Sequence, residues 1–74
     1  MMFVFNAKSL RALRKKAGWT QAQLAEYSEL SERQIRQLEG GKVTRPFADT
    51  LCRISHALGV SVEDLLELKE EALL

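Results

Sequence analysis

Two helix-start signals, eleven residues apart, constrain this chain more than any other feature. They bracket the segment QAQLAEYSELSERQIRQLEG, residues 21–40. Thr20 is followed three residues later by Gln23, and Ser31 by Gln34. A hydroxyl residue followed by glutamine at this spacing forms a capping box, in which each side chain bonds the backbone N–H of the other at a helix start. The sequence therefore predicts two short helices joined by a tight turn.

The second of these predicted helices has one apolar side and one long polar side. At 100° per residue, Ile35 and Leu38 share the side that faces the core. Arg33 then points almost directly away from the core, with Arg36 and Gln37 on either side. A helix of this kind can enter the major groove of DNA, where arginine and glutamine bond base edges. The pattern therefore predicts a recognition helix.

Three further helices are predicted around this pair, together with almost no strand. Gly18 ends the first helix, Pro46 begins the fourth, and Ser61 caps the fifth. The predicted helices cover about residues 7–17, 21–28, 32–39, 46–58 and the segment from residue 62 onward. The expected fold is all-α, with five helices in one domain over residues 7–67. Residues 1–6 form an N-terminal arm, whose apolar part is a candidate strand that pairs in a dimer, and residues 68–74 form a C-terminal tail.

The small net charge of +1 hides an asymmetry along the chain. Residues 8–53 hold ten Lys and Arg against five Asp and Glu, a balance of +5, whereas residues 54–74 hold one Lys against five acids, a balance of −4. A basic body with an acidic end fits a protein that approaches phosphates by one face. Solvated surface charge explains the same numbers, so the asymmetry favours nucleic acid only slightly.

The sequence gives no support to a metal site, a cofactor or catalysis. Cys52 is the single cysteine, which excludes an internal disulfide and a zinc cluster, and the apolar residues around it predict that it is buried. His56 has no cysteine or histidine at ligand spacing. No serine has a base and an acid to form a nucleophilic site. Because no secretion signal, membrane span or cysteine pair is found, the expected location is the cytoplasm.

Many further residues match a known family in both their order and their spacing. They are Gly18, Thr20, Gln21, Leu24, Ala25, Ser31, Ile35, residues 38–42, Arg45, Pro46, Thr50, Leu51 and residues 57–62. In these positions the span from about Ser9 to Leu66 resembles the Cro and phage-repressor helix-turn-helix family, also called the XRE family. The resemblance covers about four-fifths of the chain and implies a compact lambda-repressor-like DNA-binding domain, with its helix-turn-helix at about residues 21–40.

The resemblance also implies roles for individual residues. Arg14 and Glu39 are expected to form an ion pair between the first and third helices. The expected base-reading residues are Arg33, Gln37, Glu32, Arg36 and Gln34. The expected phosphate-binding residues are Gln21, Ser31, Arg14, Lys42 and Arg45. For each surface residue the alternative is a solvated helix face, and for Glu32 that alternative is about as good as a base contact.

The turn between the two helices departs from the family at two positions. Glu29 stands where the family usually has glycine, and Ser28 where an apolar or small residue is usual. A non-glycine residue in a left-handed conformation costs about 1 kcal/mol. Either the turn differs slightly here or the domain carries that strain.

Two functions fit these observations. The first is a sequence-specific regulator, a repressor or autoregulator, that binds a partly palindromic double-stranded operator as a homodimer, because one module contacts too few base pairs for specificity. The expected dimer interface is Leu58, Val60, Val62 and Leu66, with the Leu73–Leu74 tail as a further candidate. The second is an antitoxin-type module that neutralises a toxin partner and also binds DNA. An enzyme is not expected.

Overall fold

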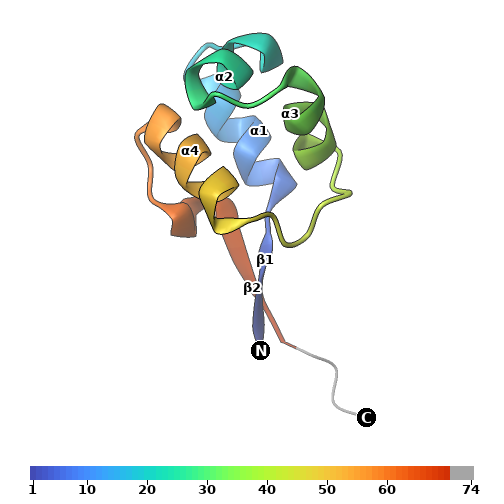
Figure 1. Cartoon of the computed structure of the whole chain (residues 1–74). Helices are drawn as coiled ribbons and strands as arrows, with labels where there is room; N and C mark the ends of the chain where they lie inside the picture. Colours follow the sequence, from blue (N-terminus) through green and yellow to red (C-terminus); the bar gives the residue numbers. More distant parts are fainter. Residues whose placement is uncertain (71–74) are drawn as a thin grey trace.

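Four helices form the body of the molecule, and a two-stranded ribbon projects from it (Figure 1). This computed structural model describes residues 1–70. The elements in chain order are β1 (Met2–Phe5), α1 (Ala7–Lys16), α2 (Gln21–Ser28), α3 (Glu32–Glu39), α4 (Ala48–Leu58), a 3-10 turn η1 (Val62–Leu65) and β2 (Leu66–Lys69). The mainly helical fold and the positions of the first three helices are confirmed. The fourth helix is present but begins at Ala48, so the prediction that Pro46 begins it is wrong.

Each helical element contributes one fully buried side chain to a single core. These side chains are Leu10, Leu24, Ile35, Ile54 and Leu65. Phe5, at the end of β1, closes the same cluster from the side of the ribbon. Because burying a leucine or isoleucine contributes about 1.5–3 kcal/mol, this cluster is the main stabilising element of so small a domain. The core thereby fixes α3 against α1 and α2, while α4 packs on α2.

The predicted capping boxes are present at both helices of the helix-turn-helix. The N–H of Gln23 donates to Thr20 Oγ1 over 3.1 Å, and the N–H of Thr20 donates to Gln23 Oε1 over 2.8 Å. Ser31 and Gln34 make the same pair of bonds. These bonds satisfy backbone donors that have no partner inside the helix. They explain why α2 begins at Gln21 and α3 at Glu32.

The prediction of a fifth α-helix is wrong. After Ser61 the chain makes one 3-10 turn, and at Leu66 the backbone becomes extended, with φ −118° and ψ 156°. Leu66 and Leu68 then alternate with Glu67 and Lys69, the period of two that belongs to a strand. The 3-10 turn is long enough to bury Leu65. The residues after it alternate as a strand does, and they can therefore pair with β1.

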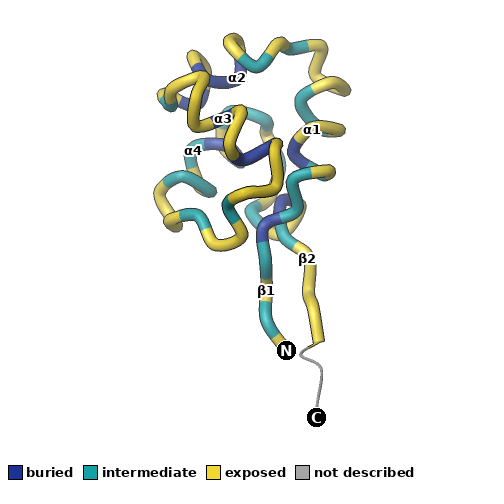
Figure 2. The backbone as a smooth tube through the Cα atoms, turned by 90° about the vertical axis from the view of Figure 1, so that its right-hand side faces the viewer, coloured by how far each residue is buried: buried dark blue, intermediate teal, exposed yellow. Residues whose placement is uncertain are grey.

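The N-terminal segment is a strand, as expected, but its partner lies in the same chain. β1 and β2 are antiparallel, and Phe3 lies opposite Leu68. Two backbone bonds join this ribbon to the body: Phe5 N–H donates to Thr44 O and Asn6 N–H to Leu65 O, each over 2.8 Å. Residues 2–5 and 66–69 thus form one ribbon (Figure 2).

Three further observations bear on the sequence predictions. Cys52 is exposed, so the prediction that it is buried is wrong; Ile54 and Ser55 form the inner side of α4. Among residues 1–70, no helix has the length and apolar character needed to cross a bilayer. No cluster of three or more metal-ligating residues is found in the same range.

Candidate nucleic-acid interface

Helix α3 turns its polar side chains to solvent, as its sequence predicts. Ile35 and Leu38 are buried on its inner side. The five residues predicted to read bases are all exposed: Glu32, Arg33, Gln34, Arg36 and Gln37. An eight-residue helix with this division of faces presents a row of hydrogen-bonding groups of the kind that bonds base edges in the major groove.

These five side chains differ in how far they are already engaged. Arg36 and Glu32 form an exposed ion pair, with 3.2 Å between Nη1 and Oε2. Gln34 accepts from the N–H of Ser31 and so serves the helix cap. Arg33 and Gln37 make no side-chain hydrogen bond or ion pair within residues 1–70. These two are therefore the side chains of α3 most available to a ligand.

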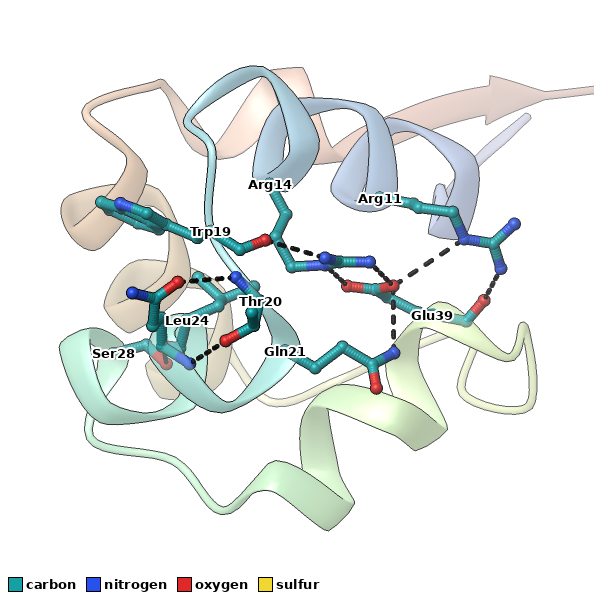
Figure 3. Close-up of polar contacts among 9 residues, drawn as sticks. Arg11, Arg14, Trp19, Thr20, Gln21, Leu24, Ser28 and Glu39 are labelled. Carbon is teal, nitrogen blue, oxygen red and sulfur yellow. Dashed lines mark hydrogen bonds and ion pairs between the residues drawn. The ribbon is translucent and has the colours of Figure 1, made fainter.

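Glu39 anchors the C-terminal end of α3 to α1. Its side chain is only 3% exposed and accepts two bonds from Arg14, Nε to Oε2 over 2.6 Å and Nη2 to Oε1 over 2.9 Å (Figure 3). The third guanidinium nitrogen of Arg14 donates to Trp19 O over 2.9 Å. A bidentate pair with every nitrogen engaged fixes both geometry and charge. The ion pair expected from the resemblance is confirmed.

Two more side chains converge on Glu39, and the sequence does not predict either contact. Gln21, at the start of α2, donates its amide to Glu39 Oε1 over 3.2 Å. Arg11, one turn before Arg14, donates to the backbone carbonyl of Glu39 over 2.9 Å (Figure 3). Glu39 therefore joins α1, α2 and α3 at one point. Finding these contacts requires the packing angles of three helices, which no local pattern provides.

The electrostatics of this cluster favour the charged forms. Burial by itself raises the pKa of Glu39, but the hydrogen bonds from Arg14 and Gln21 and the charges of Arg14 and Arg11 outweigh it, so the pKa lies below the ordinary value. The hydrogen bond to Glu39 raises the pKa of Arg14. The carboxylate is therefore ionised and held in place at neutral pH.

The five predicted phosphate-binding residues fall into two groups. Arg14 and Gln21 are bonded to Glu39, and the hydroxyl of Ser31 caps α3. Lys42 and Arg45 lie in the loop after α3, and both are exposed. Arg45 makes one weak contact, from Nη2 to Met2 Sδ over 3.3 Å. The two loop cations are the freer candidates for an anion.

A shallow hollow of about 190 Å³ connects this loop with α3. Gln34 and Gln37 line it from α3, and Arg45 and Phe47 line it from the other side. Phe47 is 84% exposed and occupies the N-cap position of α4 without a side-chain bond to the helix. Phenylalanine is not one of the residues that usually occupy an N-cap, so no capping signal in the sequence marks this position.

Four residues predicted for a dimer interface offer partial surfaces, while Leu73 and Leu74 lie outside the described residues. Leu58, Val60, Val62 and Leu66 are all half-buried. Leu58 packs against the core, so part of its apolar surface is already used within the chain. Leu66 lies at the start of β2, where it pairs with Phe5. Their surroundings are α4, η1 and the base of the ribbon.

The turn between α2 and α3 carries the predicted strain. Glu29 has φ 59° and ψ 37°, and within residues 1–70 it is the one non-glycine residue with positive φ. The N–H of Leu30 donates to Ala25 O over 2.9 Å, and that of Glu29 to Glu26 O over 3.2 Å, which is a Schellman motif. The buried hydroxyl of Ser28 donates to Leu24 O over 2.6 Å. The family's turn geometry is therefore kept with Glu29 in the glycine position.

Solved structures of three regulators are similar to this fold. The master regulator of biofilm formation SinR, in complex with DNA, is 27% identical, with a TM-score of 0.76 over 80% of this chain and 94% of that one. The restriction-modification controller protein C.AhdI from Aeromonas hydrophila is 25% identical, with 0.74 over 80% and 88%. The clp gene regulator ClgR from C. glutamicum is 36% identical, with 0.70 over 80% and 75%.

Two sequence comparisons complete these findings. No curated protein matches the chain. The profile of the helix-turn-helix family HTH_3 matches residues 10–65, from the buried Leu10 of α1 to the buried Leu65 of η1, and so includes the anchored α3 and its turn. The chain belongs to this XRE-type helix-turn-helix family of DNA-binding transcriptional regulators.

Proposed function

We propose that this protein binds double-stranded DNA sequence-specifically, with α3 in the major groove, and that it acts as a homodimeric repressor or autoregulator on a partly palindromic operator. The observation that carries the proposal is the state of Arg33 and Gln37: both are exposed on α3 and bonded to no other side chain of residues 1–70, while Glu39 and Ile35 hold the helix in place. Arginine pairs with guanine, and glutamine with adenine, through two bonds each.

The remaining polar residues supply position and affinity. Lys42 and Arg45 contact the phosphates beside α3, and the start of α2 at Gln21 contributes backbone N–H groups to a phosphate on the other side. Arg36, neutralised in part by Glu32, contacts phosphate rather than a base. Arg14 supports α3 through Glu39, and any phosphate contact that it makes is secondary to that bond.

A homodimer is proposed because the DNA-contacting surface of one domain is small. One recognition helix contacts only a few base pairs, and two copies related by a two-fold axis read two half-sites. The surface made by Leu58, Val60, Val62 and Leu66 remains part of this proposal. Its half-buried side chains leave room for a contact that extends along β2.

The first test selects binding sites from random duplexes and then measures Arg33→Ala and Gln37→Ala on the selected site. Loss of a bidentate base contact weakens binding by about 1–3 kcal/mol in each half-site, or roughly fivefold to 150-fold, and relaxes the preference at one position of each half-site. Arg53→Ala is the charge-matched control, because Arg53 lies on α4 and bonds Asp49. If both α3 variants bind the site as tightly as the wild type at matched salt, the assignment of α3 is wrong.

A second test separates phosphate contacts from base contacts. Lys42→Ala removes one cation from the loop after α3. It should weaken binding to all duplexes alike and reduce the slope of log affinity against log salt by about 0.9 for each bound subunit. Selected and scrambled duplexes are compared from low to physiological salt. A change confined to the selected duplex contradicts the phosphate role of Lys42.

A further inference from the structure

The ribbon formed by β1 and β2 has an apolar face that nothing in residues 1–70 covers at its outer end. Phe3 and Leu68 are directly opposite each other, and side chains directly opposite share a face. Phe3 is 61% exposed and Leu68 50% exposed. Phe5 and Leu66 continue the same face inward, where Phe5 enters the core. The core thus extends into an exposed apolar strip along the ribbon.

Both long edges of the ribbon are bonded to the body at their inner ends. On β1, Phe5 N–H donates to Thr44 O, and further out the guanidinium of Arg45 contacts Met2 Sδ. On β2, Leu66 N–H donates to Glu63 O, and beyond Leu66 this edge carries no bond to another segment within residues 1–70. Both views show the ribbon standing clear of the helices, at the end of the body away from α2 (Figures 1 and 2). Because Arg45 lies beside the outer end of β1, the outer end of β2 is the more open edge.

The alternation of backbone groups identifies which residues of β2 face outward. Because Phe5 N–H points away from β2, Val4 and Met2 are the residues of β1 that bond to β2, and their partners are Glu67 and Lys69. The N–H and C=O of Leu68 therefore point to the open edge. An antiparallel strand with its own leucine opposite Leu68 would exchange two bonds with it.

The two charges beside Leu68 are complementary to the same two charges on an antiparallel second copy. Glu67 and Lys69 flank it and lie on the opposite face of the ribbon, with 3.9 Å between Lys69 Nζ and Glu67 Oε1. A two-fold axis at Leu68 places Glu67 of each chain opposite Lys69 of the other. Opposite charges in directly facing cross-strand positions stabilise the pair, whereas like charges destabilise it.

We infer that a second copy of this chain docks on the open edge of β2, antiparallel and in the register that puts Leu68 opposite Leu68. The result is a four-stranded sheet in the order β1-β2-β2-β1. Its one face carries a row of Phe3, Leu68, Leu68 and Phe3, and its other face carries two Glu67–Lys69 pairs between the chains. This inference rests on the proposed homodimer and assigns it a surface, which begins at Leu66 and extends the interface proposed above along β2.

The test exchanges charges between two separate variants. Glu67→Lys gives a chain with lysine at both positions, and Lys69→Glu gives one with glutamate at both. Each should dimerise about tenfold more weakly than the wild type, because both facing pairs become repulsive. An equimolar mixture should recover the wild-type dimer constant as a heterodimer, since the facing charges are then opposite again. Sedimentation equilibrium in reducing buffer, which excludes a disulfide through the exposed Cys52, measures all of these.

Recovery in the mixture separates this register from any effect within one chain. Glu26→Lys, on the exposed side of α2, is the control for a change of two charges and should sediment as the wild type. If the variants and the mixture dimerise like the wild type, the contact lies elsewhere. If the wild type is monomeric both alone and on DNA, no second copy docks, and the apolar strip belongs to a different protein such as a toxin. Either result overturns the inference.

A parallel DNA measurement keeps this inference distinct from the proposed function. On the selected duplex, the mixture should bind as tightly as the wild type, and each variant alone more weakly. If no duplex is preferred over a scrambled one, the proposed function fails whatever the sedimentation shows. If a duplex is preferred but the two variants bind it like the wild type, the β2 contact fails while DNA recognition stands.

Discussion

The two ends of α3 are held by contacts of opposite kinds. At its N-terminal end, Ser31 bonds Gln34, and Glu29 shapes the turn before them; these residues lie within six positions of one another and all are exposed. At its C-terminal end, Glu39 is buried and its partner Arg14 lies 25 residues earlier in the chain. One end is fixed by the local backbone, and the other by the packing of three helices.

The difference shows where strain can be accepted. A cap or turn residue contributes about 1 kcal/mol, and its loss alters one turn of helix. A buried charge whose partner is removed costs about 3–5 kcal/mol, because the remaining charge stays without water. The left-handed Glu29 lies at the N-terminal end of α3, where an unfavourable residue lowers the free energy of unfolding only slightly. Its conformation persists because the core contacts of Leu24 and Ile35 determine the path of the turn.

Glu39→Ala should have the largest effect. It leaves the guanidinium of Arg14, 12% exposed, without its two charged bonds. We expect a loss of about 3–5 kcal/mol in the free energy of unfolding. At about 4–8 °C per kcal/mol for a domain of this size, the midpoint should fall by more than about 12 °C in thermal unfolding followed by circular dichroism.

The double variant Arg14→Met with Glu39→Met is its control. Replacing both charges by apolar groups removes the unpaired guanidinium and should cost clearly less than Glu39→Ala alone. Arg11 keeps its bond to the backbone carbonyl of residue 39 in both proteins. If the double variant is as unstable as the single one, the cost arises from lost packing rather than from an unpaired charge.

The same contact predicts a specific dependence on pH. Because the folded state lowers the pKa of Glu39, its ionised form contributes stability that is fully present above the pKa of the unfolded chain. That contribution is lost as the pH falls through the lower, folded pKa. Urea unfolding from pH 7 to pH 3 should therefore show a shallower acid decline in Glu39→Gln than in the wild type. Equal declines would assign the acid sensitivity to other carboxylates.

Ser31→Ala tests the other end of α3. The variant loses the hydroxyl that accepts from Gln34 N–H, and the expected cost is about 1 kcal/mol. Thr20→Ala makes the same change at α2, where Thr20 Oγ1 accepts from Gln23 N–H, and should cost a similar amount. Chemical unfolding measures both. A cost for Ser31→Ala near that of Glu39→Ala would remove the distinction between the two ends.

The sequence predicts the local end of α3 better than the distant one. The capping boxes, the helix starts and the left-handed turn are patterns of about six residues, and the structure confirms them. The Arg14–Glu39 pair followed from the family resemblance, but Gln21 and Arg11 depend on how the helices cross. Strand β2 was missed because Leu65, Leu66 and Leu68 fit one face of a helix as well as a buried turn followed by a strand. The partner that decides between them, β1, lies more than 60 residues away.

Glu29→Gly should have the smallest effect, and it is the one substitution expected to raise the free energy of unfolding rather than lower it. It is therefore the most direct test of how the N-terminal end of α3 is held. Glu29→Gly removes the left-handed strain and loses only a long contact between the exposed Glu29 carboxylate and Arg53, 3.9 Å apart. We expect a gain of up to about 1 kcal/mol, reduced by the greater freedom of glycine in the unfolded chain. Urea unfolding at matched pH measures it.

Gly59→Ala is the reverse experiment on a turn of the same design. Gly59 ends α4 with φ 69°, and its neighbour Val60 donates to Ser55 O as Leu30 does to Ala25 O. A Cβ added at Gly59 meets no atom within 4 Å, so the cost of the substitution is that of the backbone alone, about 1 kcal/mol. A gain at Glu29 that matches the loss at Gly59 means that both turns follow the same local rule. If Glu29→Gly instead destabilises the protein, the glutamate side chain holds the turn, and the N-terminal end of α3 is not governed by the backbone alone.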